Sequence, residues 1–318
     1  MQRTRTSRRR FLAISAALTA TAAWPGRARA GATMVEWRGV ALGANASIRL
    51  AHPDAGAGRQ LLRRCVAEIE RLEKIFSLYL PDSEVCRLNA AGRLELPSLE
   101  LVDLLTLAAA VSVESDGVFD VTVQPLWQRH AAQGADFDDL LPLVDWRAVS
   151  VDGDRIAFAR RGMAITLNGI AQGYITDRVA DLLRAEDMTA VLVDLGEIRA
   201  LGGRPDGTPW RVGLADPVAA GRVAAQLDLR DMALATSGGY GTPLDPTGQR
   251  NHLIDPRSGC SAPARRSVSV MAPRATVADA ASTALALLPE TAAPRLLRGL
   301  GATAAYFQDE AGLRRVRA

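Results

Sequence analysis

Two oxygen-bearing side chains four residues apart are the first pattern in this sequence that could do chemistry. Asp279 and Thr283 lie in the segment ADAAST at 278–283, which has the composition of a helix start. The four-residue spacing puts both side chains on one face of a helix. With a backbone carbonyl, a carboxylate and a hydroxyl suit a hard cation such as Mg²⁺. The spacing alone also fits an Asp279 that only complements the helix dipole.

A turn with two glycines, TLNGIAQGY at 166–174, lies between an expected strand and an expected amphipathic helix. Gly169 and Gly173 let the backbone approach a ligand closely, and the amides at a helix start attract an anion. We therefore treat the turn as a candidate phosphate site, with an ordinary strand-turn-helix connection as the alternative. Lys74 is the only lysine, which excludes a Walker loop and leaves phosphate to backbone amides, arginine or a metal.

His252 is the candidate general base. It could take a proton from a hydroxyl nucleophile near neutral pH, with the nearby carboxylate of Asp255 orienting the ring. A histidine satisfied within a loop is the alternative. A hydrolase triad of Ser237, His252 and Asp255 is a further possibility, but the chain lacks a G-x-S-x-G elbow around Ser237. His52 and His130 have no comparable setting and are expected at the surface.

Aromatic side chains stand beside polar groups in the segments FSLY at 76–79 and SDGVFDVT at 115–122. Tyr79 and Phe119 could line a planar ring system. Aromatic residues in such places also serve as core, so this pattern leaves both interpretations open.

The elements that must position these residues follow from hydrophobic periodicity. Apolar runs predict strands at 35–50, 163–167, 190–195, 210–214, 223–229, 267–271 and 304–307. Helical periodicity predicts helices at 59–75, 98–114, 174–185 and 277–288. Since the strands and helices do not alternate strictly, we expect an α+β fold of mixed sheets with packed helices.

The N-terminal 30 residues have the pattern of an export signal. Residues 7–12 read SRRRFL, a twin-arginine pattern, and Ala28-Arg29-Ala30 matches an A-x-A cleavage site. The intervening apolar run is too short to span a bilayer. We therefore expect a cleaved signal at 1–30 and a globular domain at 31–318 that is periplasmic and not an integral membrane protein.

Charge and cysteine content narrow the function classes. Without residues 1–30 the chain has 31 basic and 35 acidic residues, a net charge of about −4. The basic character of the whole chain thus comes from the signal, and a nucleic-acid partner loses its support. Three widely spaced cysteines, odd in number and without a C-x-x-C pair, leave at least one thiol free and argue against a disulfide framework and a zinc or redox pair.

Seven sequence blocks occur in an order typical of one known family. They are FSLY at 76–79, DSE with LN at 82–89, GVFD at 117–120, the turn at 169–174, ATSG at 235–238, HLIDP with Gly259, and ADA with Thr283. On these blocks the chain, from about Gly39 onward, resembles the ApbE family of FAD:protein FMN transferases. The resemblance implies the family's α+β flavin-transferase fold, with FAD as the substrate, bound between two lobes.

The resemblance also assigns site residues. Mg²⁺ is expected near the pyrophosphate, and three positions match the family's metal ligands: Asp279, Thr283 and the carbonyl of Gly169. His252 matches the histidine associated with catalysis. Positions that match FAD contacts are Tyr79, Val118, Phe119, Asp120, Thr166 and Gln172.

The implied reaction moves FMN from FAD to a threonine or serine hydroxyl of an acceptor protein and releases AMP. Family acceptors carry a short Ser/Thr-Gly-Ala-Ser/Thr motif. In this chain Leu300 precedes Gly301-Ala302-Thr303, so we expect a modifier and not its own target.

Two departures from the family pattern keep alternatives open. Thr166 stands where an acidic residue is usual, and Gln172 stands where Lys or Glu is common. These changes favour an FAD-binding assembly factor without transfer activity as one alternative. A magnesium-dependent FAD pyrophosphatase, which would use the same site without an acceptor, is another.

Overall fold

The computed structural model describes residues 17–18, 32–134, 136–219, 221–245 and 249–318. The export signal predicted at 1–30 lies outside these described residues except for the pair Ala17–Leu18. Within the described ranges, no helix has both the length and the apolar character needed to cross a bilayer. Cys65, Cys86 and Cys260 are free thiols.

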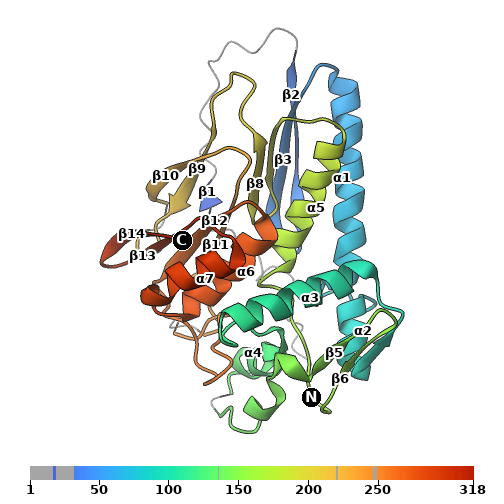
Figure 1. Cartoon of the computed structure of the whole chain (residues 1–318), viewed down its shortest axis with the longest axis vertical. Coiled ribbons are helices and arrows are strands. Elements are labelled where there is room, and N and C mark those ends of the chain that lie inside the picture. Colours follow the sequence, from blue (N-terminus) through green and yellow to red (C-terminus); the bar gives the residue numbers. More distant parts are fainter. Residues whose placement is uncertain (1–16, 19–31, 135, 220, 246–248) are drawn as a thin grey trace, which may run out of the picture.

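An antiparallel eight-stranded sheet forms the centre of the fold, in the order β14-β13-β12-β11-β8-β7-β3-β2 (Figure 1). Its strands are β2 (Thr33–Ala41), β3 (Ala44–His52), β7 (Ala190–Asp194), β8 (Ile198–Gly202), β11 (Ala233–Gly238), β12 (Ser267–Ala272), β13 (Ala304–Asp309) and β14 (Gly312–Arg317). The strand β11, which carries site residues, and β8, which follows the site residue Glu197, are therefore neighbours in the middle of this sheet.

Two smaller sheets flank the large one. The first contains β1 (Ala17–Leu18), β9 (Trp210–Ala215) and β10 (Val223–Leu229). The second contains β4 (Arg93–Glu95), β6 (Arg155–Phe158) and β5 (Val149–Val151).

Seven α-helices and four 3₁₀ turns lie in the described residues. The helices are α1 (Ala55–Phe76), α2 (Glu84–Ala91), α3 (Leu99–Glu114), α4 (Gln124–Ala131), α5 (Ala171–Ala185), α6 (Ala275–Leu287) and α7 (Ala293–Leu300). The 3₁₀ turns are η1 (Val121–Val123), η2 (Leu141–Leu143), η3 (Trp146–Ala148) and η4 (Glu290–Ala292). Figure 1 shows α1, α5 and α6 in front of the large sheet, with α2, α4, β5 and β6 gathered at one end of the molecule.

Both faces of the large sheet are buried, which the residues of β7 show. Val191 and Val193 belong to the core that also contains the apolar faces of the helices. Leu192, between them, belongs to a second core with Trp210 and Val212 of β9. Because side chains alternate across a strand, a continuous apolar run is what a strand covered on both faces requires. The predicted α+β class with packed helices is confirmed, but the sheets are not mixed, because every strand pair in the described residues is antiparallel.

Two of the predicted strands need correction. The run at 35–50 is not one strand but the hairpin β2–β3, which turns at Leu42 and Gly43 with φ angles of 46° and 82°. Residues 163–167 form no strand. The side-chain amide of Asn89 donates to the carbonyl of Ile165 at 2.8 Å and accepts its N–H at 2.7 Å, so a side chain replaces the expected strand partner.

The four predicted helices exist as α1, α3, α5 and α6, with boundaries that shift by up to four residues. The largest shift is at α1, where Asp54 caps the helix by accepting the N–H of Gly56 at 2.6 Å. The short helices α2, α4 and α7 and the strands β4, β5, β6, β8, β11 and β14 were not predicted, because their apolar periodicity is too brief.

Candidate active site

A cavity with about 1080 Å³ of empty space lies where the segment 79–169 meets α5, β11, α6 and the loop before β8. The cavity gathers ten of the eleven predicted site residues: Tyr79, Val118, Phe119, Asp120, Thr166, Gly169, Gln172, His252, Asp279 and Thr283. Asp255 is the predicted residue that does not line it.

The starts of α5 and α6 bring the predicted cation ligands together. Asp279 in the second turn of α6 accepts the N–H of Gly173 in α5, with 2.9 Å between N and Oδ2. Gly169 packs on Thr283 so closely that a β-carbon at position 169 would lie 3.0 Å from the Thr283 hydroxyl oxygen. The Thr283 hydroxyl and the backbone of Gly169 are therefore neighbours, although the two residues are 114 positions apart in the sequence.

Two buried carboxyl groups in this region, those of Asp279 and Glu197, are costly to ionise. Burial raises the pKa of Asp279 to about 7, and the nearby charge of Asp177 adds to the effect. Burial and the charge of Asp279 also raise the pKa of Glu197, a cavity residue on the loop before β8. A divalent cation beside Asp279 would offset this repulsion, so the donor set fits Mg²⁺.

The donors are one carboxylate, one hydroxyl and one carbonyl. Across the described part of the chain, no group of three or more His, Cys, Asp or Glu side chains could hold a metal. A transition-metal cage of nitrogen and sulfur ligands is therefore not formed by these residues, whereas a few oxygen donors supplemented by ligand phosphates suit Mg²⁺.

His252 lines the cavity in the neutral form. Burial lowers the pKa of its imidazole to about 4, although a hydrogen bond to the backbone of Thr242 acts in the opposite direction. Its Nδ1 atom is buried and has no hydrogen-bond partner among the described residues. A neutral imidazole with an unpaired nitrogen, in a residue that lines a cavity, can accept a proton or a hydrogen bond.

The predicted orientation of His252 by Asp255 is wrong. Both carboxylate oxygens of Asp255 accept from the guanidinium of Arg257, at 2.9 Å for Oδ1 and 2.7 Å for Oδ2. The charge of Arg257 also keeps the pKa of Asp255 low despite its partial burial. Asp255 thus pairs with a residue of its own turn, and the imidazole of His252 bonds instead to the backbone of Thr242.

The hydrolase triad is also not assembled. Ser237 of β11 lines the cavity, but its Oγ bonds to the hydroxyls of Ser282 at 2.8 Å and Thr283 at 3.2 Å. The serine therefore supports the cation ligand Thr283. With Asp255 paired to Arg257, no charge relay from Ser237 through His252 is present.

The other two histidines differ from the surface position that was expected. His130 is buried at 3% exposure, where its Nε2 bonds to the carbonyl of Gly259 at 2.7 Å and its ring stacks on Phe137. His52 is half-buried and accepts the N–H of Asp54 at 2.9 Å. The partners of His130 lie far away in sequence or in a loop, so no local pattern indicated its burial.

One wall of the cavity is aromatic. Tyr79 is 49% exposed and its hydroxyl bonds to the side chain of Asn168, while Phe119 is 4% exposed and packs beside Gly169. Trp127 of α4 also lines the cavity and was missed by the sequence analysis. The signal was available, since this aromatic residue follows the GVFD block by seven residues, but it lies outside the recognised blocks.

Asp120 has a structural task in addition to its place in the cavity. Its Oδ1 accepts the backbone N–H and the hydroxyl of Thr122, at 2.7 and 2.6 Å, and its Oδ2 accepts the N–H of Trp146 at 3.0 Å. These bonds fix the loop that carries Val118 and Phe119 against η3. Thr166 has a more local role, because its Oγ1 accepts the N–H of Asn168 within the same turn.

Gln172 lies against the loop that joins β7 to β8. Its Nε2 donates to the carbonyl of Leu195, with 3.4 Å between the atoms. Gly196 has φ of 101°, and a β-carbon there would lie 2.5 Å from the same Nε2. The glycine is required by this close approach as well as by its backbone conformation.

Sequence reasoning also missed Glu197 and Thr236. The carboxylate of Glu197 accepts the N–H of Thr236 at 3.2 Å, and both residues line the cavity. An acid directly after a glycine turn is the only sequence sign of this pair, and it is common in surface loops.

Comparison with known proteins gives concordant findings. A family model described as the ApbE family matches residues 42–307. The chain is 32% identical over 268 residues to the FAD:protein FMN transferase of Treponema pallidum strain Nichols, covering 75% of this chain and 74% of that protein. It is 26% identical over 268 residues to the FAD:protein FMN transferase of Escherichia coli K12, covering 78% and 76%.

Solved structures agree with the sequence relatives. The crystal structure of the Pseudomonas stutzeri flavinyl transferase ApbE in its apo form matches with a TM-score of 0.75 and 28% identity, over 90% of this chain and 94% of that one. The ApbE protein of Thermotoga maritima matches with a TM-score of 0.76 and 27% identity, over 90% and 97%.

Proposed function

The chain belongs to the ApbE family, and we propose that it is an FAD:protein FMN transferase that uses Mg²⁺ and modifies a threonine or serine of an acceptor protein. One observation carries this proposal. A single cavity brings together three oxygen donors for a hard cation, a neutral histidine with an unpaired nitrogen, and an aromatic wall.

Asp279, Thr283 and the carbonyl of Gly169 would hold Mg²⁺ beside the pyrophosphate of FAD. When bound there, Mg²⁺ neutralises phosphate charge and stabilises the AMP that leaves. The amides at the start of α5 support the same end of the substrate, because the first N–H groups of a helix favour an anion.

His252 acts on the acceptor. Its neutral imidazole accepts the proton of the acceptor hydroxyl as that oxygen attacks the phosphorus of the FMN half. The bond between this phosphorus and the bridging oxygen breaks, and AMP leaves with the bridging oxygen. The lowered pKa of His252, about 4, keeps the ring able to accept a proton at every pH near neutrality.

The aromatic wall and its polar edge bind the flavin half. Tyr79 and Phe119 offer ring faces, and Val118 adds an apolar contact. The polar side chains of Asp120, Thr166 and Gln172 lie around these residues in the same cavity. Gln172 keeps a hydrogen-bonding side chain where the family often has a charged one, so the substitution removes charge but not polarity.

The acceptor is proposed to be an exported or membrane-bound redox protein with an exposed Ser/Thr-Gly-Ala-Ser/Thr segment. The support is the twin-arginine pattern at 7–12 and the cleavage pattern at 28–30, which direct the chain to the periplasm. An exported transferase needs a substrate protein in the same compartment.

The experiment is a mass-spectrometric assay of residues 31–318 with FAD, Mg²⁺ and an acceptor domain that carries the motif. We expect the acceptor to gain one FMN minus water, with one AMP released per acceptor modified. His252→Ala and Asp279→Asn should lose this activity. AMP and free FMN without a modified acceptor would identify a pyrophosphatase, and intact FAD would identify a binding factor.

A further inference from the structure

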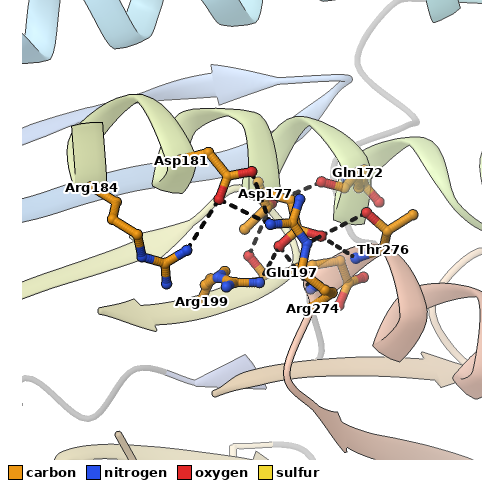
Figure 2. A network of polar contacts seen from close by, with 10 residues as sticks. Gln172, Asp177, Asp181, Arg184, Glu197, Arg199, Arg274 and Thr276 are labelled. Atoms are coloured by element: carbon orange, nitrogen blue, oxygen red, sulfur yellow. Dashed lines mark hydrogen bonds and ion pairs between the residues drawn. The ribbon is translucent and has the colours of Figure 1, made fainter. Parts of the chain in front are cut away.

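A buried carboxylate outside the cavity connects the two helices that carry the predicted cation ligands. Asp177 lies in α5 with no exposed surface, and it does not line the cavity. Its Oδ1 accepts the N–H of Ala275, and its Oδ2 accepts both the N–H and the hydroxyl of Thr276, at 2.9, 2.9 and 2.7 Å. Asp177 therefore caps the start of α6 from a different helix (Figure 2).

Two arginines complete this network. Arg199 of β8, only 4% exposed at its side chain, donates to Asp177 Oδ1 at 2.5 Å. Arg274, directly before α6, lies 3.2 Å from Asp177 Oδ2 and also bonds to Asp181 (Figure 2). Arg199 follows the cavity residue Glu197 by two positions, so the network joins the start of β8 to α5 and α6, the helices that contribute Gln172 and Asp279 to the cavity.

The two helices hold each other reciprocally. Asp177 of α5 binds the first amides of α6, and Asp279 of α6 binds the amide of Gly173 in the first turn of α5. The second contact uses Asp279 Oδ2, and among the described hydrogen bonds Oδ1 receives none, which leaves this oxygen for a ligand. The rotation and height of α6 relative to α5 thus decide where Asp279 and Thr283 stand relative to Gly169.

We propose that Asp177, held by Arg199 and Thr276, is a positioning residue that sets the geometry of the cation site by capping α6 from α5. This inference rests on the proposed function, because it assigns the network to that cation site. A shift of α6 would move both side-chain ligands together, while the carbonyl of Gly169 would stay with the turn before α5. Loss of the clamp should therefore weaken cation binding more than flavin binding.

The test measures cation binding directly, with Mn²⁺ as a paramagnetic substitute for Mg²⁺ in the presence of FAD. Thr276→Val removes one hydroxyl bond to Asp177, and Thr276→Ser keeps it. We expect Thr276→Val to raise the Mn²⁺ Kd by about tenfold and Asp177→Asn by up to about 100-fold, the range seen when partners of metal ligands are removed. Thr276→Ser should bind Mn²⁺ like the wild type.

Asp216→Asn is the matched control. Asp216 is also a buried carboxylate that accepts two backbone amides and an arginine, from Val218, Ala219 and Arg222, but it lies after β9, outside the cavity. Its substitution should lower stability without changing the Mn²⁺ Kd. The Kd for FAD in the absence of metal is read from flavin fluorescence. It should stay within about twofold of the wild-type value in every folded variant, because distant, independent sites are only weakly coupled.

Each outcome decides between the alternatives. Folded Thr276→Val and Asp177→Asn proteins that bind Mn²⁺ as tightly as the wild type would overturn the positioning role and leave the transferase proposal intact. If Asp177→Asn does not fold, the comparison of the Mn²⁺ Kd between Thr276→Val and Thr276→Ser decides the question. A wild type that binds Mn²⁺ but transfers no FMN would overturn the proposed function alone, and one that binds no Mn²⁺ would overturn both.

Discussion

Gly173 is the position where the structure predicts the sharpest effect of a single methyl group. A β-carbon there would lie 2.4 Å from the carbonyl oxygen of Ala275 and 2.8 Å from the β-carbon of Asp279. Neither neighbour is the flexible end of a long side chain, because the first is backbone and the second is the root of a predicted cation ligand. Gly173→Ala therefore has to push α6 away from α5.

The size of the effect follows from these distances. Ordinary non-bonded contacts begin about 1 Å beyond the 2.4 Å found here, so the helices must separate by roughly that amount. The bond of 2.9 Å from the Gly173 N–H to Asp279 Oδ2 would then exceed hydrogen-bonding distance. Overpacking costs about 1–3 kcal/mol, and loss of a hydrogen bond to a charged group costs about 1.5–3 kcal/mol.

The higher helix propensity of alanine offsets about 1 kcal/mol of this loss. We therefore expect the free energy of unfolding to fall by about 1.5–5 kcal/mol in urea titrations, with weaker Mn²⁺ binding by the folded protein. Gly153→Ala is the control, because a β-carbon there meets no atom within 4 Å. Equal stability and equal Mn²⁺ affinity for Gly173→Ala and the wild type would refute the account of how α5 and α6 pack.

Two further predictions concern the histidine loop. Asp255→Asn should retain most of the AMP release in the presence of acceptor, because Asp255 pairs with Arg257. His252→Ala should lower the rate of AMP release by about 10²–10⁴-fold, the usual contribution of a general base. Equal losses in the two variants would show that Asp255 does orient the ring. For pH, the unfolded chain binds a proton at His252 below about pH 6.5, whereas burial lowers the pKa of the folded state to about 4. Stability should thus fall as pH drops from about 6.5 towards 4, and urea unfolding of His252→Gln at pH 7 and pH 5 should show a smaller fall than the wild type.

Local patterns predicted the parts of the site that depend on neighbours in sequence. The spacing of Asp279 and Thr283 was sufficient to put both on one helical face. The glycines at 169 and 173 were expected to approach a ligand, and in the structure they lie against α6. The same reasoning worked for β7, whose residues 190–193 are a continuous apolar run.

The errors come from contacts between distant segments. Asn89 satisfies the backbone of Ile165 from 76 residues away, so an apolar run that reads as a strand remains without a strand partner. His130 is buried by Gly259, 129 residues distant. The error at Asp255 has a local cause. Its partner Arg257 lies only two residues away and takes the carboxylate that was expected to bond to His252.

The cavity also implies that cation and FAD bind as a coupled pair. Asp279, Thr283 and the carbonyl of Gly169 supply three oxygens, fewer than the six that Mg²⁺ takes, so phosphate oxygens and water must complete the shell. Burial raises the pKa of both Asp279 and Glu197, and the charge of Asp279 raises the pKa of Glu197 further. A pyrophosphate added to these two carboxylates without a cation would increase the repulsion, and a cation without the pyrophosphate would lack ligands. Each partner should therefore raise the affinity for the other by the same factor, as linkage requires.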